Sequence, residues 1–82
     1  MTNLEKYVKV FTETFGVSEE EAKGLKYQAI DAWDSVGHMG LIAALEENFD
    51  IMMDTDDIID LSSFEKGKEI LAKEEYGIKF DE

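Results

Sequence analysis

The first sixteen residues carry the most regular pattern of apolar and polar positions in the chain. Their apolar side chains recur at i, i+3, i+4, i+7 and i+11: Leu4, Tyr7, Val8, Phe11 and Phe15. This spacing predicts a helix with one apolar face. Thr2 and Glu5 have the spacing of a capping box, and Gly16 supplies the left-handed residue that ends many helices. We therefore expect a first helix that ends at Phe15.

A second helical pattern follows Ser35. In residues 36–49 the apolar positions fall at i, i+1, i+4 and i+8: Leu41, Ile42, Leu45 and Phe49. They predict an amphipathic helix that starts at Val36. Asp34 and Ser35 precede it, and both are residue types that cap a helix by accepting a hydrogen bond from a free amide. On its own, this pattern makes Ser35 a helix cap and nothing more.

The segment between these helices, residues 18–34, is the longest connection. Ser18 and Glu21 could cap a short helical turn, but Gly24 and the wide apolar spacing break the periodicity. We expect an ordered loop that is anchored by side chains entering the core. These anchors are Leu25, Tyr27, Ile30 and Trp33.

The last third of the chain predicts two more helices. Asp54 or Thr55 caps a short helix of one or two turns with acidic residues at its positive end. Ser62 and Glu65 have the spacing of another capping box, and they begin a last helix that runs to about Tyr76.

Gly67 lies on the inner side of this last helix, together with Phe64, Ile70 and Leu71. A glycine inside a helix costs about 1 kcal/mol relative to alanine, so we expect a neighbouring helix to approach closely there. Strand alternation, proline and internal repeats are all missing from the sequence. The predicted fold is all-α: one domain over residues 1–82, an antiparallel bundle of three main helices plus one short helix, with a long loop between helices one and two.

Composition narrows the classes of function. Twenty Asp plus Glu against eight Lys give a formal net charge of -12. Such a charge opposes nucleic acid and anionic membranes as partners and favours basic protein surfaces. A chain of this length buries only about 60% of the surface that its unfolded form exposes, which leaves little room for a sheltered enzyme cleft.

Cysteine is absent, which excludes disulfides, thiolate metal sites and a cysteine nucleophile. Any thiol chemistry would need a thiol from elsewhere. The first residues lack the charged-then-apolar order of a signal sequence, and the longest apolar run, residues 41–45, is too short to span a bilayer. We expect a monomeric, cytoplasmic protein without an integral membrane segment.

Three short motifs stand at the helix boundaries of this small acidic chain. Asp34-Ser35-Val36 precedes the second helix, LEENFDI closes it at residues 45–51, and DDIIDLSSF at residues 56–64 joins the last two helices. Together with the long first loop, these motifs resemble the acyl carrier protein family over nearly the whole chain.

The resemblance implies that Ser35 is the attachment point of 4'-phosphopantetheine, which a magnesium-dependent phosphopantetheinyl transferase takes from coenzyme A. The thiol of this arm would hold acyl groups as thioesters, in a chain that has no cysteine of its own. The protein would be a carrier rather than an enzyme, with no catalytic residue and no metal site. Its partners would be acyl ligases, acyltransferases and synthases of fatty-acid, lipid or related biosynthesis.

The resemblance also implies a recognition surface around the serine. Asp34 would repel a phosphate on Ser35, so we expect it to serve recognition by the transferase or magnesium placement. The outer face of the second helix presents an apolar strip with two glutamates beyond it: Val36, Met39, Ala43, Glu46 and Glu47. Such a face suits shallow docking on a basic patch of a partner enzyme.

Three residues near the serine depart from the pattern of housekeeping fatty-acid carriers. Gly37 and Gly40 stand where those carriers usually have acidic residues, and Val36 replaces the more frequent leucine. Residues 33–39 look more like stand-alone carriers of specialised pathways. His38 is the only side chain that would titrate near neutrality, and we expect it to be a surface contact rather than a pH switch.

Three other classes of protein fit parts of the sequence. Aminoacyl, peptidyl and D-alanyl carriers share the fold and the serine. A calcium-binding loop would use Asp54, Asp56 and Glu65, but its sixth position, which requires glycine, is Ile59. A helical interaction domain would use Ser35 only as a cap or as a phosphorylation site.

Part of the core could also shelter cargo. The apolar residues between the second helix and the short helix could part to enclose an acyl chain, with methionine providing adaptable walls. These residues are Leu45, Met52, Met53, Ile58, Ile59 and Leu61. Ordinary core packing is the default expectation for the same set.

Overall fold

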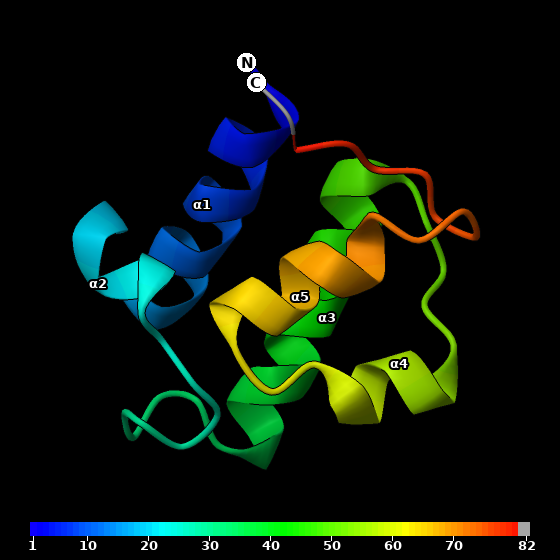
Figure 1. The fold of residues 1–82 in the computed structure, drawn as a ribbon. Coiled ribbons are helices and arrows are strands. Elements are labelled where there is room, and N and C mark those ends of the chain that lie inside the picture. The colour runs from blue at the N-terminus through cyan, green and yellow to red at the C-terminus, as the bar shows by residue number, and fades with distance from the viewer. Residues whose placement is uncertain (81–82) are drawn as a thin grey trace.

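The structure is a computed structural model that describes residues 1–80, and these residues form five helices (Figure 1). The helices are α1 Asn3–Phe15, α2 Glu19–Lys23, α3 Ser35–Phe49, α4 Thr55–Asp60 and α5 Phe64–Leu71. This part of the chain contains no strand, and its β-type pairing is limited to an isolated bridge between Lys26 and Ser63. The prediction of an all-α chain is therefore confirmed over the described residues.

The helices share one apolar core. α1 packs against both α2 and α3, and α5 crosses in front of α3 in the view of Figure 1. The radius of gyration is 11.5 Å, close to the value of about 12 Å expected for a compact chain of this length. Within the described range, none of the helices has the length and apolar character that a bilayer crossing needs.

α1 forms as its sequence pattern predicts. Thr2 accepts a hydrogen bond from the Glu5 amide while the Glu5 side chain accepts one from the Thr2 amide, which completes the capping box. Gly16 ends the helix with a φ of 66°, in the left-handed region that favours glycine. The predicted apolar face is buried except for Leu4, which is half-buried.

Gly67 confirms the predicted close approach of a second helix. A Cβ added there would lie 2.1 Å from the hydroxyl oxygen of Tyr7 on α1. That hydroxyl is buried and donates a hydrogen bond of 2.7 Å to the carbonyl of Phe64. Burial raises the pKa of Tyr7, so its phenol stays a donor at physiological pH. The glycine thus allows α5 to pack directly on the Tyr7 side chain of α1.

The predicted end of the last helix, near Tyr76, is wrong. α5 ends at Leu71, and the next residues form turns. The Ile78 amide donates a hydrogen bond of 3.0 Å to the Leu71 carbonyl, so the chain folds back on the end of the helix. Gly77 permits this reversal with a φ of 67°. The side chains of Lys73 and Tyr76 make hydrogen bonds to α4, which are described below. These bonds stabilise the turn relative to a longer α5.

The predicted loop over residues 18–34 contains an additional helix. The capping box of Ser18 and Glu21 forms, and Ala22 is fully buried on the side of α2 that faces the core. The prediction of one short helix is therefore wrong, because α2 and α4 are both short. Of the four predicted anchors, Leu25 and Trp33 are buried and Ile30 is half-buried, whereas Tyr27 is 38% exposed.

Candidate functional site

Ser35 is the first residue of α3, and Asp34 is the cap of that helix. The Asp34 side chain accepts a hydrogen bond of 2.8 Å from the Gly37 amide, and its carbonyl accepts one of 2.8 Å from the His38 amide. The helix thus begins one residue before Val36. The interpretation of Ser35 as the cap is wrong, since Asp34 fills that role. The Ser35 side chain is exposed, and its hydroxyl makes no hydrogen bond to the described part of the chain.

Gly37 lets the preceding loop pass close to the first turn of α3. A Cβ added to Gly37 would lie 1.9 Å from the carbonyl oxygen of Ala32 and 3.4 Å from a carboxylate oxygen of Asp34. Backbone atoms cannot rotate away from such a contact. Packing therefore requires glycine at this position.

An open groove of about 380 Å³ begins at Ser35 and extends along the gap between α3 and α4. Its lining is mostly apolar, and it comes from the start of α3, from α4 and from the segments on either side of the isolated bridge. The lining residues are Tyr27, Ser35, His38, Met39, Ile58, Ile59, Leu61 and Ser62. A group attached to the Ser35 hydroxyl would therefore have an apolar surface directly beside it.

His38 connects the loop, α3 and α4 at the floor of this groove. Its Nδ1 accepts a hydrogen bond of 3.0 Å from the Trp33 indole, and its Nε2 lies 2.7 Å from the carbonyl oxygen of Ile58. An indole N–H can only donate, so Nδ1 must be unprotonated and Nε2 must carry the hydrogen that it donates. The ring is half-buried and held on both sides. His38 is therefore fixed on both sides while it still lines the open groove, and its expected role as a surface contact stays a prediction.

The outer face of α3 carries most of the predicted recognition strip. Val36 is 79% exposed, Met39 is 54% exposed, and Ala43 and Glu47 are also exposed. Glu46 differs, because its carboxylate is half-buried and accepts a hydrogen bond of 2.9 Å from the amide of Met53. Glu46 thus anchors the segment that follows α3. Its carboxylate is less accessible to a partner protein than the sequence pattern predicted.

The predicted cargo-sheltering set divides into two groups. Leu45, Met53 and Leu61 are buried and Ile58 is half-buried, as core packing requires. Met52 and Ile59 are surface residues, with exposed fractions of 87% and 72%. Ile59 lines the same groove as Ser35 and Met39, so its exposed side chain adds to the apolar surface near Ser35, whereas Met52 does not line the groove.

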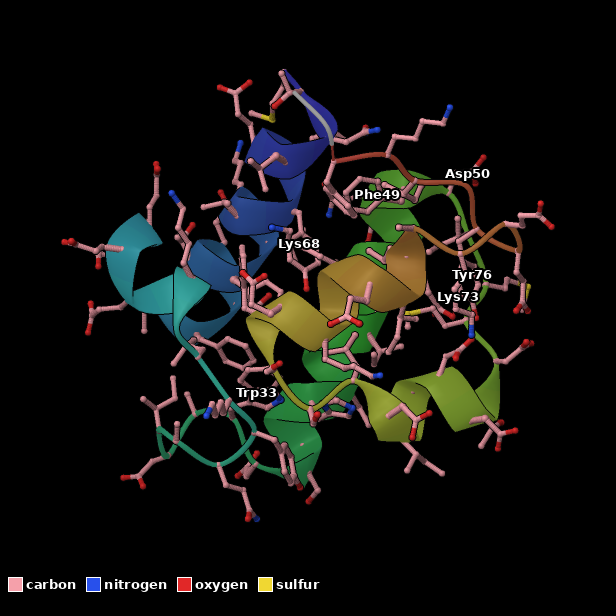
Figure 2. The ribbon with its side chains drawn as sticks, in the orientation of Figure 1. Trp33, Phe49, Asp50, Lys68, Lys73 and Tyr76 are labelled. Atoms are coloured by element: carbon pink, nitrogen blue, oxygen red, sulfur yellow. The ribbon has the colours of Figure 1, made fainter. Side chains whose placement is uncertain are left out.

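A buried carboxylate on α4 is a feature that the sequence pattern missed. Asp57 is only 6% exposed, and it accepts hydrogen bonds of 2.7 Å from the Lys73 ammonium and 2.6 Å from the Tyr76 hydroxyl. Figure 2 shows Lys73 and Tyr76 reaching toward α4 from the turn after α5. The Lys73 bond, together with that from Tyr76, lowers the pKa of Asp57. Burial and the bond to Asp57 raise the pKa of Tyr76 to about 12. No local sequence signal pairs residues this far apart.

The three acidic residues that a calcium-binding loop would use, Asp54, Asp56 and Glu65, do not form one cluster in the structure. Among residues 1–80, the carboxylates close enough to share an ion belong to Asp54, Asp57 and Glu75, with ligand atoms within 4.8 Å of one another. Asp56 and Glu65 are not part of this group. The Lys73 ammonium already pairs with Asp57, so a cation would have to compete with it.

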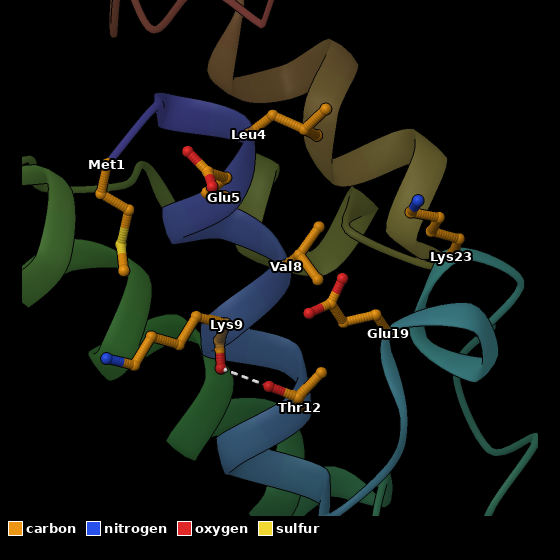
Figure 3. Close-up of a pocket in the computed structure, with 8 residues that line it drawn as sticks. All are labelled: Met1, Leu4, Glu5, Val8, Lys9, Thr12, Glu19 and Lys23. Atoms are coloured by element: carbon orange, nitrogen blue, oxygen red, sulfur yellow. Dashed lines mark hydrogen bonds between the residues drawn. The ribbon is translucent and has the colours of Figure 1, made fainter.

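A second hollow of about 300 Å³ lies between α1 and α2, away from Ser35 (Figure 3). Its sides include Glu5 and Lys9 from α1 and Glu19 and Lys23 from α2. Acidic and basic side chains are mixed there, and the one hydroxyl among the lining side chains, that of Thr12, donates a hydrogen bond of 3.0 Å to the Lys9 carbonyl. The groove at Ser35 is therefore the better candidate site.

Comparison of the chain with protein-family models, with curated proteins and with solved structures gave no match. The interpretation of the Ser35 groove consequently depends on the chain's own residues and their geometry. Those features are an exposed and unbonded serine hydroxyl, a helix start capped by the preceding aspartate, and an apolar groove beside the serine.

Proposed function

We propose that this protein is an acyl carrier that holds acyl groups as thioesters on a 4'-phosphopantetheine arm attached to Ser35. The observation that carries the proposal is the free Ser35 hydroxyl at the mouth of the apolar groove. Because Asp34 caps α3, modification of Ser35 removes no hydrogen bond from the fold. A serine that served as the cap would lose its structural role on modification.

The start of α3 suits a phosphodiester electrostatically. The amides of Ser35 and Val36 make no hydrogen bond within the described chain, whereas the Gly37 and His38 amides are bonded to Asp34. Free amides and the helix dipole favour an anion at this end. The Asp34 carboxylate opposes a second negative charge, so its exposed oxygen supports a role in placing magnesium or in transferase recognition.

The modification itself is a balanced group transfer. The Ser35 oxygen attacks the phosphorus next to the pantetheine of coenzyme A, an O–P bond forms, and the bond to the second phosphate breaks. Adenosine 3',5'-bisphosphate leaves, and the serine proton passes to a base of the transferring enzyme. The bound arm then supplies a thiol. In this account the protein is a substrate and a carrier, and partner enzymes perform the chemistry.

The surface around Ser35 supports docking by basic partner enzymes. Val36, Met39 and Ala43 offer an exposed apolar strip on α3, and Glu47 adds a negative charge beyond it. With a net charge of -12, the molecule would attract a positively charged patch over long range. The arrangement of α1, α3 and α5 around one core fits the antiparallel bundle expected of such carriers.

Intact-protein mass spectrometry tests the proposal. The protein is incubated with coenzyme A, magnesium and a broad-specificity phosphopantetheinyl transferase, beside Ser35→Ala and Ser62→Ala. Ser62 lines the same groove but does not start a helix, which makes it the matched control. We expect one phosphopantetheine on wild type and Ser62→Ala and none on Ser35→Ala. No gain on wild type with several transferases would instead support a helical interaction domain.

A further inference from the structure

The interior behind the groove is filled by aromatic rings. His38 stacks on Trp33 at a centroid distance of 6.2 Å, and Trp33 stacks on Phe15 at 5.1 Å. Phe11 then contacts Trp33 edge to face at 5.6 Å. Trp33 and Phe11 have no exposed surface. On the side of His38, a chain that enters the groove at Ser35 therefore has packed aromatic rings behind the groove lining.

The bond from His38 to Ile58 closes the passage between α3 and α4. In the described part of the chain, it is the one hydrogen bond that joins these two helices. To reach the buried Leu45 side chain, which does not line the groove, an acyl chain would have to push the two helices apart there. That movement would break the bond between His38 and Ile58 and leave the Ile58 carbonyl without its partner beside apolar side chains, which is unfavourable.

We infer that this carrier holds short aliphatic acyl groups on its surface groove, outside the core, and that His38 is the residue that sets this limit. The inference depends on the proposed function. It deepens that function by naming the class of cargo. Short groups contact the apolar lining formed by Met39, Ile58 and Ile59. Longer chains gain no further burial, because the hydrogen bond between His38 and Ile58 keeps α3 and α4 together.

A series of loaded proteins tests this inference. A broad-specificity transferase attaches the acylated arm to Ser35 from acetyl-, butyryl-, hexanoyl- and octanoyl-coenzyme A, and the melting temperature of each form is measured. A chain buried in the core would stabilise the fold with each added methylene, by about 5 °C or more between the butyryl and octanoyl forms. We expect a difference below about 2 °C in the wild type. Emission from Trp33, the single tryptophan, should also stay constant.

Two variants assign the limit to His38. His38→Ala removes both hydrogen bonds, and we expect its octanoyl form to melt about 5 °C or more above its butyryl form. His38→Gln is the matched control, because its amide offers an acceptor for Trp33 and a donor for Ile58. It should behave like the wild type. A flat series in a folded His38→Ala would show that His38 is not the limiting residue.

The wild-type series decides the cargo class even if His38→Ala does not fold. A melting temperature that rises with chain length, or a shift in Trp33 emission with the octanoyl group, would overturn the inference while leaving the carrier function intact. Failure of the transferase to load Ser35 from any of these compounds would remove the proposed function, and the inference with it.

Discussion

Replacement of Gly37 by alanine tests whether the loop before α3 holds the site in place. The added Cβ would lie 1.9 Å from the Ala32 carbonyl oxygen and 3.1 Å from its carbonyl carbon. Both are backbone atoms, so relief requires movement of the loop or of the first turn of α3. Since Asp34 lies between the two segments, the cap of α3 would be disturbed as well.

The expected magnitude follows from two opposing terms. Overpacking of this kind costs up to about 3 kcal/mol, and the better helix propensity of alanine returns about 1 kcal/mol. We therefore expect Gly37→Ala to lower the free energy of unfolding by about 2 kcal/mol, with a fall in melting temperature on the order of 10 °C. Transfer of phosphopantetheine to the neighbouring Ser35 should also slow.

Gly40→Ala is the control in the same helix. Nothing lies within 4 Å of a Cβ added at Gly40, so only the propensity term applies and stability should rise by about 0.5–1 kcal/mol. Urea unfolding followed by far-ultraviolet circular dichroism measures both variants, from shifts of the midpoint at constant slope. The reasoning is refuted if Gly37→Ala is as stable as the wild type, or if both substitutions shift stability in the same direction.

Three further predictions concern charge. Because hydrogen bonds lower the pKa of Asp57, its stabilising contribution is present above its unfolded value of about 3.9 and is lost as pH falls through the lower folded value. The advantage of wild type over Asp57→Asn in urea unfolding should therefore shrink below about pH 4, and an advantage unchanged at low pH would contradict this. Glu46→Ala should lower the free energy of unfolding by about 1 kcal/mol, because the Met53 amide loses its acceptor. Glu47→Ala should change the free energy of unfolding by no more than about 0.5 kcal/mol. Equal losses of stability for the two variants in thermal unfolding would count against the structural role of Glu46. The melting temperature should rise with added salt, since a net charge of -12 repels itself, and a value independent of ionic strength would exclude this repulsion as a significant term.

The parts of the fold that depend on local pattern were predictable from the sequence. The apolar stripe and capping box placed α1 correctly, and the unusual Gly67 correctly indicated the close contact that Tyr7 makes. The start of α3 was missed by one residue because Asp34 and Ser35 are both good caps by residue type. Only the hydrogen bond from the Gly37 amide shows which of them serves.

The parts that depend on contacts between distant residues were not predictable. His38 and Ile58 are separated by 20 positions, and no periodicity pairs a ring nitrogen with a backbone carbonyl. The early end of α5 has the same origin, because Lys73 and Tyr76 leave the helix to bond Asp57 on α4. Glu46 was assigned to the surface by its type, although its carboxylate binds a backbone amide.

The central claim is that Ser35 carries an acylated phosphopantetheine arm, and peptide mass mapping tests it most directly. The protein is loaded from acetyl-coenzyme A by a phosphopantetheinyl transferase, digested, and compared before and after treatment with hydroxylamine, which cleaves thioesters. We predict one acetyl-phosphopantetheine on the peptide that contains Ser35 and loss of only the acetyl group on treatment. An unmodified Ser35 peptide, or an adduct on another serine, would contradict the claim.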